Sequence, residues 1–146
     1  YLGRITAIDT SEDMLKIAKS KNPSAKYIHA DMFGLPFKNK SFDKVVTMRV
    51  WNHLGKKDLR KAIKEAKRVL KKSGYLIFDI EEKSALRRLA SAFYKKIFRP
   101  TGYKIYQYSI PEIRKILSEE GFIIVGRRFL KHRIGRQIIL KMQLEK

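Results

Sequence analysis

Hydrophobic and polar positions follow two different periods along this chain, and the change of period marks the expected elements. Short apolar runs rich in β-branched residues predict strands over residues 4–9, 26–30, 42–50 and 75–80. Apolar positions at helical spacing predict helices over residues 11–22, 56–72, 83–98 and 109–121. Strands that alternate with helices form a parallel sheet with right-handed crossovers. We therefore expect an α/β fold.

Local signals give the ends of these elements. Thr10 or Ser11 is expected to cap the first helix, and the stripe of Met14, Leu15, Ile17 and Ala18 is expected to be buried. Ser73-Gly74 is expected to end the helix over 56–72. The run over 75–80 is nearly all apolar, which is typical of a strand buried on both faces.

The chain ends in a different pattern. Two further apolar runs, over 122–130 and 137–144, are separated by only a short turn around Gly135. So short a connection requires the two strands to pair antiparallel as a hairpin.

The composition limits the classes of protein to consider. A chain of 146 residues with 44% hydrophobic residues suits one core, so we expect a single domain over residues 1–146. The absence of cysteine excludes disulfides and thiolate metal sites and suits a reducing cytoplasm. No apolar run approaches the ~20 residues of a membrane span. The three histidines lack ligand-like spacing, so no metal site is expected.

The charge is strongly positive. Lys and Arg number 34 against 14 Asp and Glu, a formal net charge of +20. Such an excess favours a polyanionic partner, with a merely basic surface as the alternative.

Four segments in order carry a resemblance to a known family. They are Ala7-Ile8-Asp9 with the acids that follow, Asp31 with Leu35-Pro36-Phe37, Ser41-Phe42-Asp43 with the strand that follows, and Arg68-Val69-Leu70-Lys71-Lys72-Ser73-Gly74. Together they resemble the class I S-adenosylmethionine-dependent methyltransferases. The resemblance implies a Rossmann-like, mostly parallel sheet with a C-terminal antiparallel hairpin, and S-adenosylmethionine as cofactor.

The same resemblance implies a cofactor site. Asp9 corresponds to the acid that accepts the ribose hydroxyls, and Asp31 to the acid that receives the adenine amino group. The other cofactor-binding candidates are Thr10, Met14, Met32, Phe33 and Arg49. For either aspartate the alternative is a turn residue bonded to its own backbone.

The segment after the third strand is implied to face the methyl group. Asn52 and His53 are the catalytic candidates, with His53 as a base if the acceptor must lose a proton. A structural histidine is the alternative. Trp51 is expected either to stack on a base of the acceptor or to pack in the core.

One family element is missing from the sequence. The glycine-rich turn that precedes the ribose-binding acid by ~20 residues cannot fit, since eight residues precede Asp9. We therefore expect an N-terminally truncated fold without the first strand and helix, in which two strands lose their central neighbour. We therefore expect residues 1–146 alone to bind S-adenosylmethionine weakly and to have doubtful methyltransferase activity.

Candidate acceptor-binding residues combine cations with aromatic rings. They are Trp51, Arg87, Arg88, Tyr94, Lys95, Lys96, Tyr103 and Tyr106. Cations bind phosphates and aromatic faces stack on unpaired bases, so this composition favours RNA, either tRNA or rRNA. The alternatives are an ordinary amphipathic helix, a small-molecule or quinone-type methyltransferase, and a non-catalytic RNA-binding module with a decayed methyltransferase fold.

Overall fold

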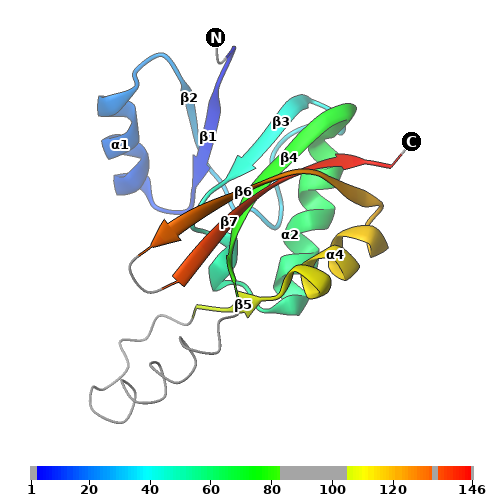
Figure 1. Ribbon diagram of the computed structural model, residues 1–146. Coiled ribbons are helices and arrows are strands. Elements are labelled where there is room, and N and C mark those ends of the chain that lie inside the picture. Colours follow the sequence, from blue (N-terminus) through cyan, green and yellow to red (C-terminus); the bar gives the residue numbers. More distant parts are fainter. Residues whose placement is uncertain (1–2, 83–104, 133–134, 146) are drawn as a thin grey trace. The chain divides into compact units, whose positions relative to one another are not determined.

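The computed structural model describes residues 3–82, 105–132 and 135–145 (Figure 1). The chain groups into two compact units, Tyr1–Lys38 and Asn39–Lys146, here called unit 1 and unit 2. Each unit has its own sheet. The expectation of a single domain stays a prediction.

Unit 1 is a strand–helix–strand motif. Strands β1 (Thr6–Asp9) and β2 (Lys26–His29) pair in parallel and are joined by helix α1 (Glu12–Lys21). Ser11 caps α1 by accepting a hydrogen bond from the backbone N–H of Met14, as one of the two expected caps. The expected buried stripe is wrong for Met14 and Ile17, which are 53% and 49% exposed. A two-stranded sheet offers the helix only a narrow face to pack against.

Unit 2 is built on a mixed five-stranded sheet. Its strands are β3 (Phe42–Thr47), β4 (Leu70–Glu82), β5 (Gln107–Tyr108), β6 (Phe122–His132) and β7 (Gly135–Leu144). The order is β3-β4-β7-β6, and β5 also pairs with β4. Strands β3 and β5 run parallel to β4, while β6 and β7 form the predicted antiparallel hairpin.

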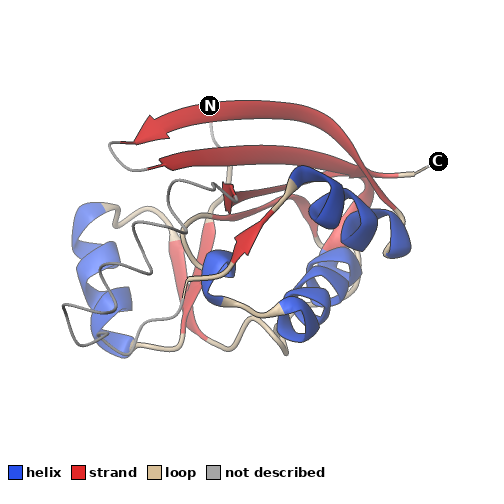
Figure 2. Cartoon of the chain, turned by 60° about the horizontal axis from the view of Figure 1, so that its bottom comes forward, coloured by secondary structure: helices blue, strands red, loops and turns tan. Residues whose placement is uncertain are grey.

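The described helices of unit 2 cover one face of this sheet. They are η1 (Trp51–His53), α2 (Lys56–Val69) and α4 (Ile110–Glu119). Figure 2 shows α2 and α4 on the same side of the strands. The fully buried core consists of Leu59, Ile63, Phe78, Leu76, Ile80, Ile113, Leu117, Ile138, Leu140 and Met142, with others. Each such side chain contributes ~1.5–3 kcal/mol relative to an exposed one.

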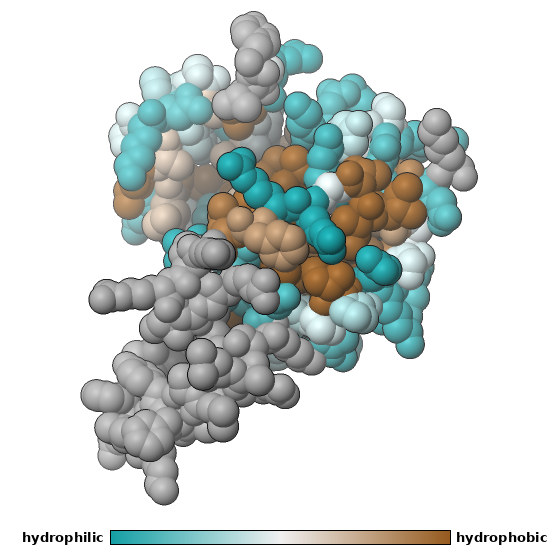
Figure 3. Space-filling view, viewed as in Figure 1, coloured by the Kyte–Doolittle hydropathy of each residue, from teal (hydrophilic) through white to brown (hydrophobic). Residues whose placement is uncertain are grey.

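The opposite face of the same sheet is more open. Val46, Ile123 and Val125 are 59%, 45% and 45% exposed. Figure 3 shows hydrophobic residues gathered over this face and crossed by hydrophilic side chains. The expectation that residues 75–80 are buried on both faces is wrong for Tyr75 and Ile77, which are half-buried, because both α2 and α4 pack on the other side.

The junction between α2 and β4 differs from the prediction. The helix ends at Val69 rather than Lys72, and β4 begins at Leu70. The carbonyls of Arg68 and Val69 accept hydrogen bonds from the N–H groups of the chain entering β3, at 2.9 and 2.8 Å. A long-range pairing therefore ends the helix. Gly74 lies within β4, where a Cβ would stand 2.9 Å from the Asp43 carbonyl oxygen, so this close approach requires glycine.

The expected absence of the family's first strand and helix stays a prediction. Within the described residues, β1 pairs only with β2, and β3 pairs only with β4. The described elements thus form a Rossmann-like α/β arrangement of strands and covering helices. In the described part of the chain no helix has the length and apolarity to cross a membrane. Nor do three potential metal ligands gather anywhere among the described residues.

Candidate active site

In unit 1 the two candidate acids follow neighbouring strand ends. Asp9 is the last residue of β1, and Asp31 follows β2 by two residues. The Ala30 N–H donates to the Asp9 carbonyl at 3.1 Å, and His29 Nε2 lies 2.8 Å from the Thr10 carbonyl oxygen. The two loops therefore lie side by side at one edge of the sheet, as the carboxyl ends of parallel strands do.

Both acids also shape their own loops. Asp9 Oδ1 accepts a hydrogen bond from the Ser11 N–H at 2.8 Å, and Asp31 Oδ1 accepts one from the Phe33 N–H at 2.9 Å. These are the turn-forming bonds that the sequence left open as an alternative. Neither Oδ2 makes a hydrogen bond to a described residue. One oxygen of each carboxylate thus fixes the turn and the other remains able to accept a further donor.

Exposed apolar side chains accompany the acids in unit 1. Met14 and Phe33 are 53% and 41% exposed, and Met32 is half-buried. Thr10 is exposed. An adenine ring requires an apolar surface beside its polar contacts. The roles assigned to these residues stay predictions.

In unit 2 the candidate catalytic segment is the short helix η1, which follows β3. Trp51 and Asn52 are each only 5% exposed, whereas His53 is exposed. The Trp51 ring lies 4.9 Å from the Phe78 ring, centroid to centroid, at an interplanar angle of 48°. The structure therefore shows the core packing that was one of the two alternatives for Trp51; a stacking role stays a prediction.

Strand β5 and the residue before it hold η1 and its C-cap in place through two hydrogen bonds. The Tyr106 N–H donates to the Asn52 carbonyl at 2.7 Å, and the Tyr108 hydroxyl donates to the Leu54 carbonyl at 2.6 Å. Burial raises the pKa of Tyr108 to about 12, with smaller contributions from Tyr106 and Glu112. The buried side-chain oxygen of Asn52 has no hydrogen-bond partner among the described residues.

Sequence reasoning missed Asp79, which is fully buried in β4. Its Oδ1 accepts a hydrogen bond from the Arg49 backbone N–H at 2.6 Å, and its Oδ2 accepts one from Gln137 Nε2. Arg49 has a φ of 60°, which non-glycine residues seldom adopt. Asp79 therefore stabilises the turn between β3 and η1. A lone acid within an apolar run was the available signal.

Other acceptor-binding candidates are placed only in part. Arg87, Arg88, Tyr94, Lys95, Lys96 and Tyr103 lie outside the described residues. Tyr106 is half-buried, and its ring lies 3.4 Å from the position of a Cβ built on Gly55. The cofactor-binding candidate Arg49 has an exposed side chain, and its backbone N–H bonds to Asp79. Its role at the cofactor stays a prediction.

Sequence comparison finds relatives along most of the chain. Residues 1–78 match the family model described as a methyltransferase domain. An uncharacterized protein of Methanocaldococcus jannaschii is 31% identical over 144 residues, covering 85% of this chain and 56% of its own. Demethylmenaquinone methyltransferase of Staphylococcus aureus is 32% identical over 134 residues, covering 88% of this chain and 54% of its own.

Solved structures with the same fold include two methyltransferases. A magnesium protoporphyrin IX methyltransferase from Synechocystis, with bound SAH, has a TM-score of 0.80 at 22% identity and covers 98% of this chain and 64% of its own. A SAM-dependent methyltransferase from Methanosarcina mazei has a TM-score of 0.81 at 20% identity, covering 98% and 83%. At these identities the likeness shows the fold.

The matched segment contains both acids and the strand that leads to η1. The chain spans about half the length of the curated relatives it matches. On the match to the family model and the identity to these relatives, the chain belongs to the class I S-adenosylmethionine-dependent methyltransferases.

Proposed function

We propose that the protein transfers a methyl group from S-adenosylmethionine to a small-molecule acceptor, with a demethylmenaquinone-like ring as the first compound to test. The observation that carries the proposal is the pair of acids at neighbouring strand ends of unit 1, each with one oxygen open to a further donor. Family membership and the 32% identical demethylmenaquinone methyltransferase support it.

The donor set of unit 1 fits this cofactor. The Oδ2 atom of Asp9 is suited to the ribose hydroxyls, since a carboxylate accepts such hydrogen bonds strongly. Asp31 is suited to the adenine amino group, and Met14 and Phe33 provide exposed apolar surface. When bound, the cofactor supplies the methyl group on a sulfonium, an electrophile whose positive charge disappears as the methyl group leaves.

The residues of unit 2 are suited to position the acceptor. A displacement at a sulfonium gains much of its rate from orientation and from exclusion of water. Asn52 is buried and held by Tyr106, while exposed His53 is the candidate base for an acceptor that carries a proton. The Asp79 hydrogen bond to Arg49 fixes the turn that leads into this segment.

The test is methyl transfer by the whole protein from radiolabelled S-adenosylmethionine. A quinone and lipid extract and demethylmenaquinone itself are the expected acceptors. Total RNA from a strain without this protein is the comparison. Label in the small-molecule fraction, lost in Asp9→Ala, supports the proposal. Cofactor binding without transfer to any fraction contradicts it and favours the non-catalytic module.

RNA stays a second candidate acceptor. The net charge of +20 favours RNA, but the relatives do not support an RNA acceptor. The aromatic and basic residues that also favour RNA lie mostly outside the described residues. Label found only in RNA would favour this candidate over the small molecule.

A further inference from the structure

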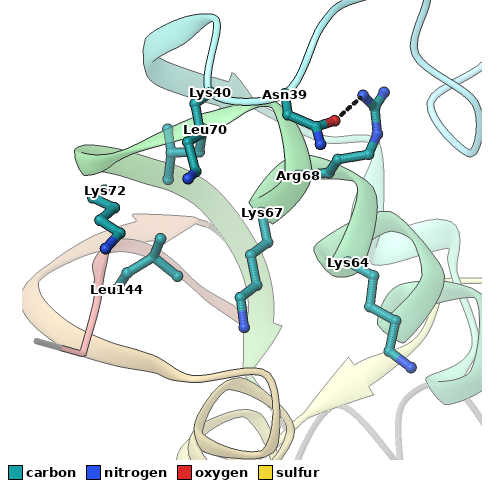
Figure 4. Close-up of a pocket in the computed structure, with 8 residues that line it drawn as sticks. All are labelled: Asn39, Lys40, Lys64, Lys67, Arg68, Leu70, Lys72 and Leu144. Carbon is teal, nitrogen blue, oxygen red and sulfur yellow. Dashed lines mark hydrogen bonds between the residues drawn. The ribbon is translucent and has the colours of Figure 1, made fainter.

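Unit 2 contains a basic pocket away from the η1 segment. Its volume is about 420 Å³, and its lining residues are Asn39, Lys40, Lys64, Lys67, Arg68, Leu70, Lys72 and Leu144 (Figure 4). It lies where α2 ends and where β3 and β4 begin. Helix η1 and strand β5 lie at the other ends of β3 and β4. The pocket is therefore separated from the proposed acceptor site by the length of the strands.

Positive charge is in excess within this pocket, since five of its eight lining residues are cations and none is an acid. Glu65 forms a bidentate ion pair with Arg68, and its hydrogen bonds raise the pKa of the Arg68 guanidinium. Lys64 lies 3.8 Å from a Glu120 carboxylate oxygen. Lys67 donates to the Glu120 backbone carbonyl at 2.7 Å, a contact that leaves its charge uncompensated.

Two further lysines contribute to the excess of positive charge in the pocket. The ammonium groups of Lys40 and Lys72 make no hydrogen bond or ion pair with the described residues. Figure 4 shows Lys72 extending toward Leu144, and Lys40 beside Leu70. Most of the lining surface is apolar, with Leu70 and Leu144 among its residues, and cations near such a surface act through a lower dielectric than in open water.

The backbone at Lys40 adds an independent observation. Lys40 has a φ of 56°, in the left-handed region where glycine or asparagine is favoured. Its N–H donates to the Arg68 carbonyl at 2.9 Å, which ties the turn to the end of α2. A lysine at this position is backbone-strained, and it lines the pocket.

We propose that this pocket binds a phosphate group. Phosphate oxygens accept hydrogen bonds from several ammonium groups at once, and lysine binds phosphate as a point charge. Lys40, Lys67 and Lys72 are the donors without a carboxylate partner. The site holds a phosphate-bearing molecule, either a free polyphosphate or a nucleic-acid backbone, away from the segment that faces the methyl group.

The experiment is calorimetric titration of the full chain with inorganic pyrophosphate at low ionic strength. The double variant Lys40→Gly with Lys72→Gln is expected to bind at least about tenfold more weakly, since it removes two of three uncompensated cations. The matched control is Lys71→Gln. Lys71 neighbours Lys72 on the same strand but pairs with Asp43 at 2.8 Å and does not line the pocket. The pyrophosphate affinity of the Lys71→Gln control should stay within about twofold of the wild-type affinity.

The single variant Lys40→Gly distinguishes an effect on pyrophosphate binding from an effect on folding stability. This change relieves the left-handed lysine, so the thermal midpoint is expected to be unchanged or higher while pyrophosphate affinity falls. Equal pyrophosphate affinity in the wild-type chain, the double variant and the control overturns the proposal. Binding of polyglutamate as tight as that of pyrophosphate, at equal charge, overturns the assignment to phosphate.

A single-stranded RNA of twelve nucleotides distinguishes the two sources of phosphate. If the nucleic-acid backbone occupies the pocket, pyrophosphate competes with RNA and the double variant weakens both. If RNA affinity is unchanged in the double variant while pyrophosphate affinity falls, a free polyphosphate is the occupant. Both results support a phosphate site. If the pocket binds no phosphate, the proposal of methyl transfer to a small molecule is unaffected.

Discussion

The two units of the chain differ in how they are stabilised. No described residue of unit 1 is buried, and α1 has no buried side chain. Every buried residue in the described part of the chain belongs to unit 2, from Trp51 to Met142. The proposed cofactor acids thus belong to a motif with little core of its own, whereas the proposed acceptor segment belongs to a packed sheet. Local hydrogen bonds determine the geometry of the first site, whereas packing and hydrogen bonds between distant segments determine that of the second.

The largest expected effect is on the core of unit 2. Phe78→Ala removes a fully buried ring that packs on Trp51 and should reduce the free energy of unfolding by ~3–5 kcal/mol. Ile17→Ala, in α1 of unit 1, should cost less than about 1 kcal/mol, since that side chain is 49% exposed. Urea unfolding of both variants measures the difference. Similar losses would show that unit 1 has a core comparable to that of unit 2.

The next effect concerns the buried carboxylate of unit 2. Asp79→Ala removes the carboxylate that accepts hydrogen bonds from the Arg49 N–H and from Gln137 Nε2, and should destabilise the chain by ~2–4 kcal/mol. Asp43→Ala removes an exposed carboxylate and is the control, with an expected loss below about 1 kcal/mol. Hydrogen exchange of the Arg49 amide should accelerate only in the Asp79 variant. A protected Arg49 amide in that variant would argue against the hydrogen bond.

Substitution of Asp9 in unit 1 should affect cofactor binding more than it affects folding stability. In a chain extended by the family's first strand and glycine-rich turn, Asp9→Ala should weaken S-adenosylmethionine binding by ~1.5–3 kcal/mol through lost charge-assisted contacts. Stability should fall by only about 1 kcal/mol, from the lost bond to the Ser11 N–H. Calorimetry and thermal unfolding give the two values. Unchanged affinity would remove Asp9 from the cofactor site.

Residues 1–146 without that extension are expected to bind the cofactor at least about tenfold more weakly than the extended chain. The reason is that the described strands β1 and β3 each have one partner strand only. The same calorimetric titration compares the two chains. Equal affinity would mean that the cofactor acids need no neighbouring strand.

The smallest effect at neutral pH is that of Tyr108. Tyr108→Phe loses the bond to the Leu54 carbonyl and should cost about 1 kcal/mol. The folded pKa, about 12, is above the ordinary value of 10, so burial of neutral Tyr108 stabilises the fold below pH 10 and that contribution is lost as the pH rises from 10 to 12. The deficit of the variant should therefore shrink over that range. Tyr75→Phe is the control, because its hydroxyl makes no hydrogen bond to the described residues.

Local chemistry in the sequence determined much of the fold. The order of strands and helices, the Ser11 cap, the capping box of Ser109 with Glu112, and the terminal hairpin all follow from residues within a few positions of one another. The sequence motifs that contain Asp9 and Asp31 also predicted that these acids lie at strand ends. A short polar side chain after a strand acts on its own backbone, so its position can be inferred without distant contacts.

Only the tertiary structure decided the rest. The end of α2 depends on residues that enter β3, the burial of Trp51 depends on Phe78, and the turn at Arg49 depends on Asp79 in a different strand. These partners are separated by about 27 to 30 positions and belong to different elements. Periodicity records which face of an element is apolar. It does not record which distant backbone group or ring will meet that face, because pairing energies between elements exist only after the chain has folded.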